Sequence, residues 1–409
     1  MRGWFPGYTV VGVASLAFVA TAPGQTFILS QLNLPLSTEL SITPLTLNTA
    51  YTIATVASAL PLVWLGRGVD HFGPRRAMAL IALLVGLSCL AMSAARGLFT
   101  VFLGFLLLRF FAQGGLALVS QHAVAMWFHR RLGAMQGIKQ VVVFAAWAPL
   151  PLATTLVIGQ LGWRSTYVLF GAVVAALVAP IALVLLRDRP EAVGLTLDGD
   201  AVLRDAEPAA GLELPWTTAE AMTTRAYWVI AAVFFAAPLI GTAMLFDLQP
   251  ILLSRGLSPL EAAAPVTAWT LTMAGLAIPS GMLTDRLRPR VLLTAGTLFF
   301  ALGPLILCDA RHVVTASAAM VSFGVGQSLV ASAGGAALAR FYGRAHHGAI
   351  RASIARIGVV GTGLGPIVTG LGLHLTGAYG APLLALGLFG LLLCFVAWTV
   401  AAPVRGSAS

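Results

Sequence analysis

The sequence predicts an all-helical integral membrane protein, with twelve transmembrane helices arranged as two parallel repeats of six. Its composition, the spacing of its apolar stretches and a ladder of residues at constant offset support this prediction. Of its 409 residues, 58% are hydrophobic and 9% are charged, whereas a soluble domain carries about 25% charged residues. Long stretches of this kind can be satisfied only in lipid.

A helix needs about 20 apolar residues to cross the hydrocarbon core. Read with that window, the chain has candidate spans at about 9–33, 45–66, 76–95, 99–125, 136–158, 166–186, 226–250, 260–282, 291–308, 313–339, 352–375 and 381–402. The polar stretch between the sixth and seventh spans predicts three regions. They are a six-helix bundle over 1–186, a linker over 187–225 and a second bundle over 226–409.

The positive charges predict orientation. Almost all cations are arginines in alternate short loops, and the formal net charge is +10. This pattern indicates topology signals and not a nucleic-acid surface, so no nucleic-acid partner is expected. The positive-inside rule then places both termini and the linker in the cytoplasm of a cell whose inner membrane holds the chain.

The two halves match at a nearly constant offset. Asp285 follows Asp70 by 215 residues, and the same offset joins the residue pairs Pro35 and Pro250, Gly66 and Gly281, Pro151 and Pro366, and Gly162 and Gly377. Gln113 and Gln327 lie 214 residues apart, a slip of one residue. An even number of helices per repeat inserts both copies in one orientation, so the repeats are parallel and a solute path is expected between them.

The loop after the second span carries a motif that is repeated in the second half. Residues 66–76 read GRGVDHFGPRR and residues 281–290 read GMLTDRLRPR. Both resemble the signature loop of the major facilitator superfamily. The candidate gating residues are Gly66, Asp70, Gly73, Arg75, Arg76, Gly281, Asp285 and Arg290.

The resemblance implies transport by alternating access. Asp70 would meet the start of the eleventh helix near Arg351, Asp285 would meet the start of the fifth, and both contacts would lock one side closed. We expect Gly66 to permit close helix approach and Gly73 to take a positive φ. The alternative is a basic loop that only sets topology.

Four strings resemble the monocarboxylate and oxalate/formate branch of that superfamily: WFHRRLGAMQG at 127–137, GWRSTY at 162–167, RDRPEAVGL at 187–195 and FYGRAHHG at 341–348. Carriers of that branch place cations in the eighth and eleventh helices. Here 267–273 and 358–363 contain none. An anion site would therefore have to use Arg109 or Arg356.

Two ionisable residues in the spans are candidates for substrate binding or coupling. Arg109 stands near the middle of the fourth span, where an arginine costs at least about 2.5–3.5 kcal/mol. It either meets an anion or coupling group or holds helices together. Asp247 is the only carboxylate within the seventh span; it could titrate, close an outer gate, or be solvated at a cavity mouth.

Amides and a phenol form a second group of candidates. Gln113 and Gln327 occupy matching places and suit hydrogen bonding to a solute, as Gln25 and Tyr51 do more weakly; each could equally join helices. Three further polar side chains, His122, Lys139 and Arg356, lie near helix ends. Snorkelling to the interface explains Lys139 and Arg356, whereas His122 is either interfacial or a proton-coupling group.

The first functional hypothesis is secondary transport of a small organic anion such as a monocarboxylate, coupled to protons. The alternatives are an efflux carrier for apolar or amphipathic compounds and a solute sensor that no longer transports. An ATP-driven pump and an enzyme are disfavoured, because the chain has neither a P-loop nor a hydrolase signature. The expected partners are a solute, protons and the bilayer, and the chain is expected to act as a monomer. No cofactor or metal is expected, since Cys89, Cys308 and Cys394 lie in apolar runs without ligand spacing.

Overall fold

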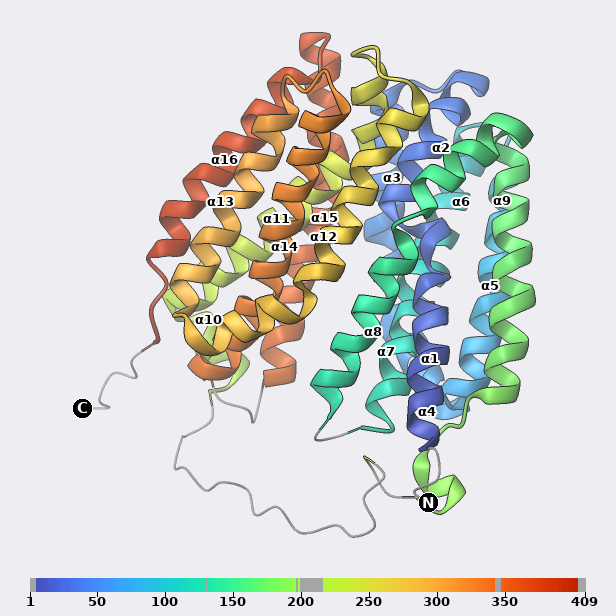
Figure 1. Cartoon of the computed structure of the whole chain (residues 1–409), viewed down its shortest axis with the longest axis vertical. Coiled ribbons are helices and arrows are strands. Elements are labelled where there is room, and N and C mark those ends of the chain that lie inside the picture. The colour runs from blue at the N-terminus through green and yellow to red at the C-terminus, as the bar shows by residue number, and fades with distance from the viewer. Residues whose placement is uncertain (1–4, 129–130, 196–197, 199–215, 343–346, 404–409) are drawn as a thin grey trace. The chain divides into compact units, whose positions relative to one another are not determined.

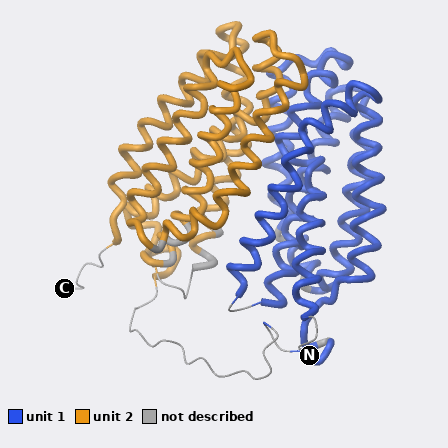
Figure 2. The backbone as a smooth tube through the Cα atoms, viewed as in Figure 1, with its two compact units in different colours: residues 1–206 blue, residues 207–409 orange. Residues whose placement is uncertain are grey.

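The computed structural model describes residues 5–128, 131–195, 198, 216–342 and 347–403. The chain divides into two compact units, unit 1 over Met1–Ala206 and unit 2 over Glu207–Ser409 (Figure 2). This division falls inside the predicted linker. Every described element is a helix.

Unit 1 follows the predicted six spans, with several interruptions (Figure 1). Its elements are α1 (Pro6–Val19), η1 (Ala22–Gly24), α2 (Thr26–Glu39), α3 (Pro44–Ala59), α4 (Leu62–Phe72), α5 (Pro74–Ser93), α6 (Leu98–Leu107), η2 (Leu108–Leu116), α7 (Ala117–Ala125), α8 (Leu132–Trp147), α9 (Leu150–Leu185) and η3 (Pro190–Val193). The first span is α1, η1 and α2 in series, and the fourth is α6, η2 and α7. These two interrupted spans position the candidate site.

Unit 2 has longer uninterrupted helices. Its elements are α10 (Thr218–Met222), α11 (Arg225–Leu253), α12 (Pro259–Arg286), α13 (Pro289–Leu307), α14 (Val313–Tyr342), α15 (His347–Thr376) and α16 (Gly380–Trp398). Six of these correspond one for one to the predicted seventh to twelfth spans.

Ten described stretches are long and apolar enough to cross a membrane, and the difference from twelve has a physical cause. The stretch Leu132–Leu185 has 54 residues, about 80 Å of helix at 1.5 Å per residue, so it must cross a core of about 30 Å twice. Gly162, with φ 77°, breaks it into the fifth and sixth spans. The second span is split at Leu60 and Pro61 into α3 and α4, which are too short to count singly. The all-helical membrane fold is therefore confirmed.

The backbone repeats the sequence ladder. Gly162 and Gly377, 215 residues apart, have φ 77° and 72°. Ser41 and Gly256 stand at the same offset and have φ 55° and 86°. Equivalent turns in the two units are thus made by the same unusual backbone conformation, even where one copy lacks glycine.

A π-helix accounts for the one-residue slip in the ladder. Arg96 and Arg311 keep the 215-residue offset, but Gln113 and Gln327 do not. Between these positions unit 1 has the π-helix η2, whereas α14 is α-helical along its length. A π-turn holds one residue more than an α-turn, so the slip is an insertion into the fourth helix. The 215-residue offset returns by Pro366, beyond the following loop.

In unit 2, α11 and α15 pack with their backbones in contact. A Cβ atom on Gly358 would lie 3.0 Å from the Phe234 carbonyl oxygen, and one on Gly365 would lie 2.5 Å from that of Leu239. Gly361, one turn from each, would collide with the carbonyl oxygen of Phe235. This glycine ladder fixes the contact between the seventh and eleventh helices.

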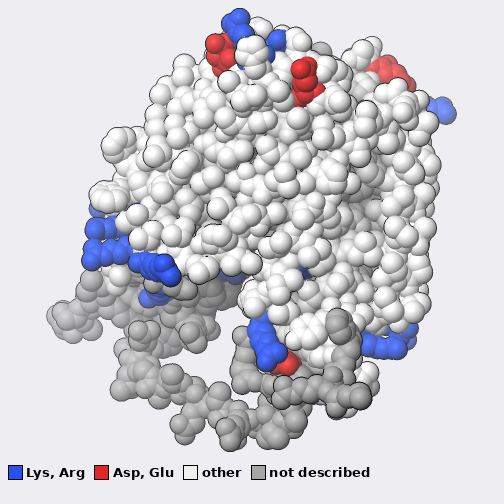
Figure 3. Space-filling model, viewed as in Figure 1, with Lys and Arg blue, Asp and Glu red and all other residues white. Residues whose placement is uncertain are grey.

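Charged side chains gather at the ends of the units. On the face drawn in Figure 3, the described Lys, Arg, Asp and Glu side chains leave a broad surface without charge between those ends. Such a surface suits the hydrocarbon core.

Candidate functional site

The first span of unit 1 is interrupted at its middle by the 3₁₀ turn η1. Gly24 in this turn approaches η2 closely, because a Cβ atom there would lie 2.6 Å from the Leu108 carbonyl oxygen and 2.9 Å from the Ala112 Cβ. Only glycine permits this contact. Irregular backbone at membrane depth occurs where protein buries it or where it lines a cavity, and broken helices form binding sites in transporters.

Arg109 extends from η2 to this turn. Its Nη1 donates to the Gly24 carbonyl oxygen at 3.3 Å, and its guanidinium carbon lies 5.1 Å from the centroid of the Tyr51 ring. The residue is 5% exposed. Among the side chains that the structure describes, no carboxylate lies within 4.0 Å of it. Arg109 is therefore a buried cation held by one carbonyl dipole and one aromatic face.

Three of the other predicted residues surround this arginine or its turn. The Tyr51 hydroxyl shares a hydrogen bond of 2.9 Å with Thr26 Oγ1, which fixes the ring beside Arg109. Gln25 directly follows Gly24, but its amide donates to Thr21 Oγ1 at 2.9 Å. Gln113 lies about one π-turn beyond Arg109, and its buried Oε1 accepts no hydrogen bond from the described residues.

Asp247 of unit 2 lies in the contact between α11 and α15. It is 2% exposed and accepts a hydrogen bond from the Thr369 hydroxyl. Burial, and then the charge of Asp247, raises the pKa of the nearby Tyr379 hydroxyl above its ordinary value. The carboxylate is therefore enclosed, and the alternative of a solvated residue at a cavity mouth is wrong for this structure.

The two matching amides differ in their partners. Gln327 Oε1 accepts from the indole nitrogen of Trp269 at 2.9 Å, and Trp269 is itself buried between α12 and α14. Gln327 therefore joins two helices, while Gln113 keeps an acceptor available.

The predicted gating loop contains a contact that the sequence did not suggest. Gly73 has φ 79°, as predicted. A Cβ atom there would also lie 2.7 Å from the carboxylate carbon of Asp188, whose Oδ1 accepts from the Arg75 backbone nitrogen at 2.8 Å. Arg75 Nε donates to the Leu183 carbonyl oxygen at 2.7 Å. The first linker residues therefore cap α5, where a carboxylate is favourable.

The remaining motif residues are placed differently from one another. A Cβ atom on Gly66 would meet nothing within 4 Å, so this glycine does not serve the close helix approach expected of it, and one on Gly281 would meet nothing either. Arg76 is exposed, and the Arg290 guanidinium lies 5.1 Å from the ring centroid of Trp398.

The side chains of Asp70 and Asp285 lie outside the described part of the chain, and their gating contacts stay predictions. Their loops differ in backbone conformation, because Arg288, with φ −69°, stands where the first copy has Gly73.

Sequence reasoning missed Gly24, Thr26 and Asp188. The adjacent Pro23 and Gly24 were a usable signal for a helix break inside the first span. No local signal joined Asp188 to a loop 113 residues away.

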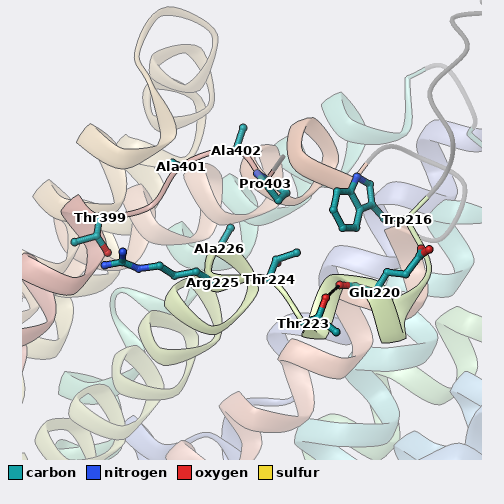
Figure 4. A pocket seen from close by; sticks show the side chains of 10 residues that line it. All are labelled: Trp216, Glu220, Thr223, Thr224, Arg225, Ala226, Thr399, Ala401, Ala402 and Pro403. Carbon is teal, nitrogen blue, oxygen red and sulfur yellow. Dashed lines mark hydrogen bonds between the residues drawn. The ribbon is translucent and has the colours of Figure 1, made fainter. Parts of the chain in front are cut away.

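Two hollows in the described structure do not coincide with these clusters. One, of about 660 Å³, lies in unit 2 beside the start of α11 and the end of α16 (Figure 4). Its arginine, Arg225, is exposed, and its acid, Glu220, accepts from the Thr217 backbone nitrogen at 2.8 Å. The other, of about 470 Å³, is an apolar groove between α1 and α8 in unit 1.

Comparisons with known proteins agree on the fold. The family model of the Major Facilitator Superfamily matches residues 14–264 and 230–409. The structure resembles that of a bacterial homologue of the human lysosomal transporter Spinster, with TM-score 0.75, 14% identity and all of both chains covered. It also resembles the human organic anion transporter MFSD10, with TM-score 0.62, 16% identity, and 96% of this chain and 100% of that one covered. At such identities the likeness concerns the fold alone.

Curated relatives match over a shorter stretch. Two proteins named for multidrug resistance, MdtD of Cronobacter sakazakii and of Salmonella typhi, are 28% and 29% identical over 144 residues. Each alignment covers 35% of this chain and 31% of the relative. The chain thus matches about a third of those proteins' length.

Proposed function

This chain belongs to the major facilitator superfamily and is a secondary transporter, and on that premise we propose that it carries small organic anions. The observation that carries the proposal is Arg109, a buried cation without a described carboxylate partner. A monocarboxylate is the simplest ligand that supplies the missing charge.

The arrangement around Arg109 supports a reversible anion site. A guanidinium offers five N–H donors in a planar fork that matches a carboxylate. The Gly24 carbonyl at 3.3 Å and the side chain of Tyr51 engage part of this fork, and the rest of it can meet a ligand. The unengaged Gln113 Oε1 can accept a hydrogen bond from a hydroxyl of the same ligand.

Three further expectations belong to the same proposal. The chain is an inner-membrane protein whose arginine-rich ends face the cytoplasm, as the positive-inside rule predicts. Asp247, enclosed by Thr369 and close to Tyr379, is proposed as a residue that couples transport to protons. Alternating access by rocking of the two halves, with Asp70 and Asp285 in the gating loops, completes the cycle.

A ligand screen by thermal shift tests the anion site. A ligand at about 100 times its Kd stabilises the folded state by about 2.7 kcal/mol. Carboxylates are expected to raise the melting temperature of the wild type but not of Arg109→Gln. The matched control is Arg76→Gln, which removes an exposed charge and should keep the response. Equal stabilisation of the wild type and Arg109→Gln would refute the role of Arg109.

Efflux of amphipathic compounds is the second candidate. The partial match to proteins named for multidrug resistance favours it. Stabilisation by lipophilic cations, unchanged in Arg109→Gln, would support efflux and make Arg109 a structural residue.

A further inference from the structure

The only lysine of the chain, Lys139, is buried inside unit 1. It stands seven residues inside α8, and its side chain is 1% exposed. Snorkelling to the interface, the expectation from the sequence, is therefore wrong. Depth along a helix does not fix the face to which a side chain turns, and here it turns into the contact among α1, α7 and α8.

The surroundings of the Lys139 amine are poor in polar groups. Its Nζ lies 5.0 Å from the centroid of the Phe18 ring and donates to Ser120 Oγ at 3.4 Å. Ser120 gives its own proton to the Ala14 carbonyl oxygen at 2.7 Å. An ammonium carries three donors, and this site offers one long hydrogen bond and one aromatic face.

The titratable groups on the packed elements supply no negative charge. Within Pro6–Val19, α1 carries only Tyr8. His122 is the one on α7, Arg164 and Tyr167 are those on α9, and Arg131 stands at the N-cap of α8. None of these is a carboxylate, and no described carboxylate lies within 4.0 Å of Lys139. Burying an unpaired ion is unfavourable, because it loses its hydration without gaining an opposite charge.

A groove lies beside the helix neighbours of this residue. The apolar groove of about 470 Å³ between α1 and α8 is lined by Ser15 of α1 and by Ile138 and Val142 of α8, the neighbours of Lys139 in sequence and on the next turn. A small separation of these two helices would join this groove to the amine. An ammonium would then gain the solvation that the packed contact denies it.

We propose that Lys139 is a proton-binding site of the transport cycle. In the packed arrangement burial favours the neutral amine, with its proton released to water. When α1 and α8 separate, the nitrogen lone pair takes a proton from water and the ammonium is hydrated in the groove. The proposal rests on the chain being a secondary transporter and is independent of the anion site at Arg109.

A single lysine makes the test direct. Lysine labelled with ¹³C at the ε position, fed during expression, marks this residue alone in the full-length purified protein. The expected result is a ¹³C signal that moves with pH between about pH 5 and pH 9. A signal that stays constant over this range would overturn the proposal, whatever the protein transports.

Transport measurements in proteoliposomes complete the test. The probe is a carboxylate or lipophilic cation that stabilises the purified protein. The wild-type rate should change about tenfold per pH unit on one side of its midpoint, as binding of one proton requires, and that midpoint should match the ¹³C titration. Lys139→Met, which is never charged, and Lys139→Arg, which always is, should lose the step whose midpoint matches the ¹³C titration, whereas a step that belongs to Asp247 should remain.

His312→Gln, which removes an exposed imidazole outside the proposed sites, is the matched control and should keep the wild-type pH profile. Retention of that profile by Lys139→Met would refute the coupling role, even if the ¹³C signal titrates. Loss of carboxylate binding in Arg109→Gln bears only on the anion site, so the two proposals fail separately.

Discussion

The contact between α11 and α15 in unit 2 corresponds to the contact between the first and fifth helices of unit 1, but the two are packed differently. The ladder Gly358, Gly361 and Gly365 brings α15 onto the backbone of α11. The residues 215 positions earlier, on the fifth helix of unit 1, are Val143, Ala146 and Leu150. These positions carry side chains instead of glycines, and Ala146 lines the groove between α1 and α8. The equivalent helices thus meet backbone to backbone in unit 2 and border an apolar groove in unit 1.

The buried ionisable groups follow this difference. In the contact between α11 and α15, Asp247 is fixed by Thr369. In the contact beside the groove, the Lys139 amine lies over the Phe18 ring and donates to the Ser120 hydroxyl.

In both units an arginine donates to the carbonyl oxygens at the end of the third helix of the repeat, but the two arginines do not occupy equivalent positions. In unit 1, Arg164 at the start of the sixth span donates to the carbonyl oxygens of Ser93 and Ala95, at 2.6 and 2.7 Å. These carbonyls end the third helix. Glu39 accepts from the same guanidinium at 2.9 Å.

In unit 2, the matching carbonyls of Cys308 and Ala310 accept from Arg255, at 2.9 and 3.1 Å. Arg255 corresponds to Leu40 of unit 1, and not to Arg164. The need to satisfy the carbonyls at a helix end is constant, whereas the position that supplies the arginine is not.

Breaking the glycine ladder should have the largest effect. Gly361→Val places a side chain on the Phe235 carbonyl oxygen and should cost about 3 kcal/mol, the upper end for overpacking. Thermal unfolding in detergent measures the loss. Gly281→Val is the matched control, because a Cβ atom there meets nothing within 4 Å. An unchanged melting temperature for Gly361→Val would show that the two helices do not depend on backbone contact.

Exchanging the arginine positions sharpens the second comparison. Arg164→Gln removes charged hydrogen bonds to two carbonyls and should cost about 2 kcal/mol. Adding Leu40→Arg, which copies the position that Arg255 has in unit 2, should restore about half of the loss. The melting temperatures of the single and double variants decide. A double variant less stable than Arg164→Gln alone would contradict the equivalence of the two units.

The smallest effect is expected at the phenol beside Arg109. Tyr51→Phe removes the hydrogen bond to Thr26 and should cost about 1 kcal/mol. The aromatic face under the guanidinium stays, so carboxylate stabilisation should persist. Tyr51→Leu removes the face as well and should weaken that response. A full response in Tyr51→Leu would exclude the ring from the site.

Much of the fold could be predicted because the repeat and the apolar spans are local patterns. The pairs Asp70 with Asp285 and Gly162 with Gly377 aligned the two repeats, and the apolar spans gave the number of helices. The π-helix corresponds to the one-residue slip at Gln113. The cause of that slip could not be predicted, because the sequence does not show whether an inserted residue lengthens a loop or forms a π-turn in a helix.

The site was less predictable. Arg109 and Tyr51 were expected as candidates, but their meeting at Gly24 depends on contacts of Arg109 across 85 residues of chain to Gly24 and 58 residues to Tyr51. Lys139 was misjudged because its face depends on how α8 packs. The roles of Asp70 and Asp285 stay predictions.

The π-helix η2 sets the rotational phase between the two halves of the fourth span. Arg109 lies near its start and Ser120, beside Lys139, lies beyond its end. Deleting one residue between them would restore an α-helix and turn Ser120 by about 100° away from its place. Ser120 would then move away from Lys139, while Arg109 would keep its position. One extra residue thus keeps Arg109 and the serine that contacts Lys139 in register on a single helix.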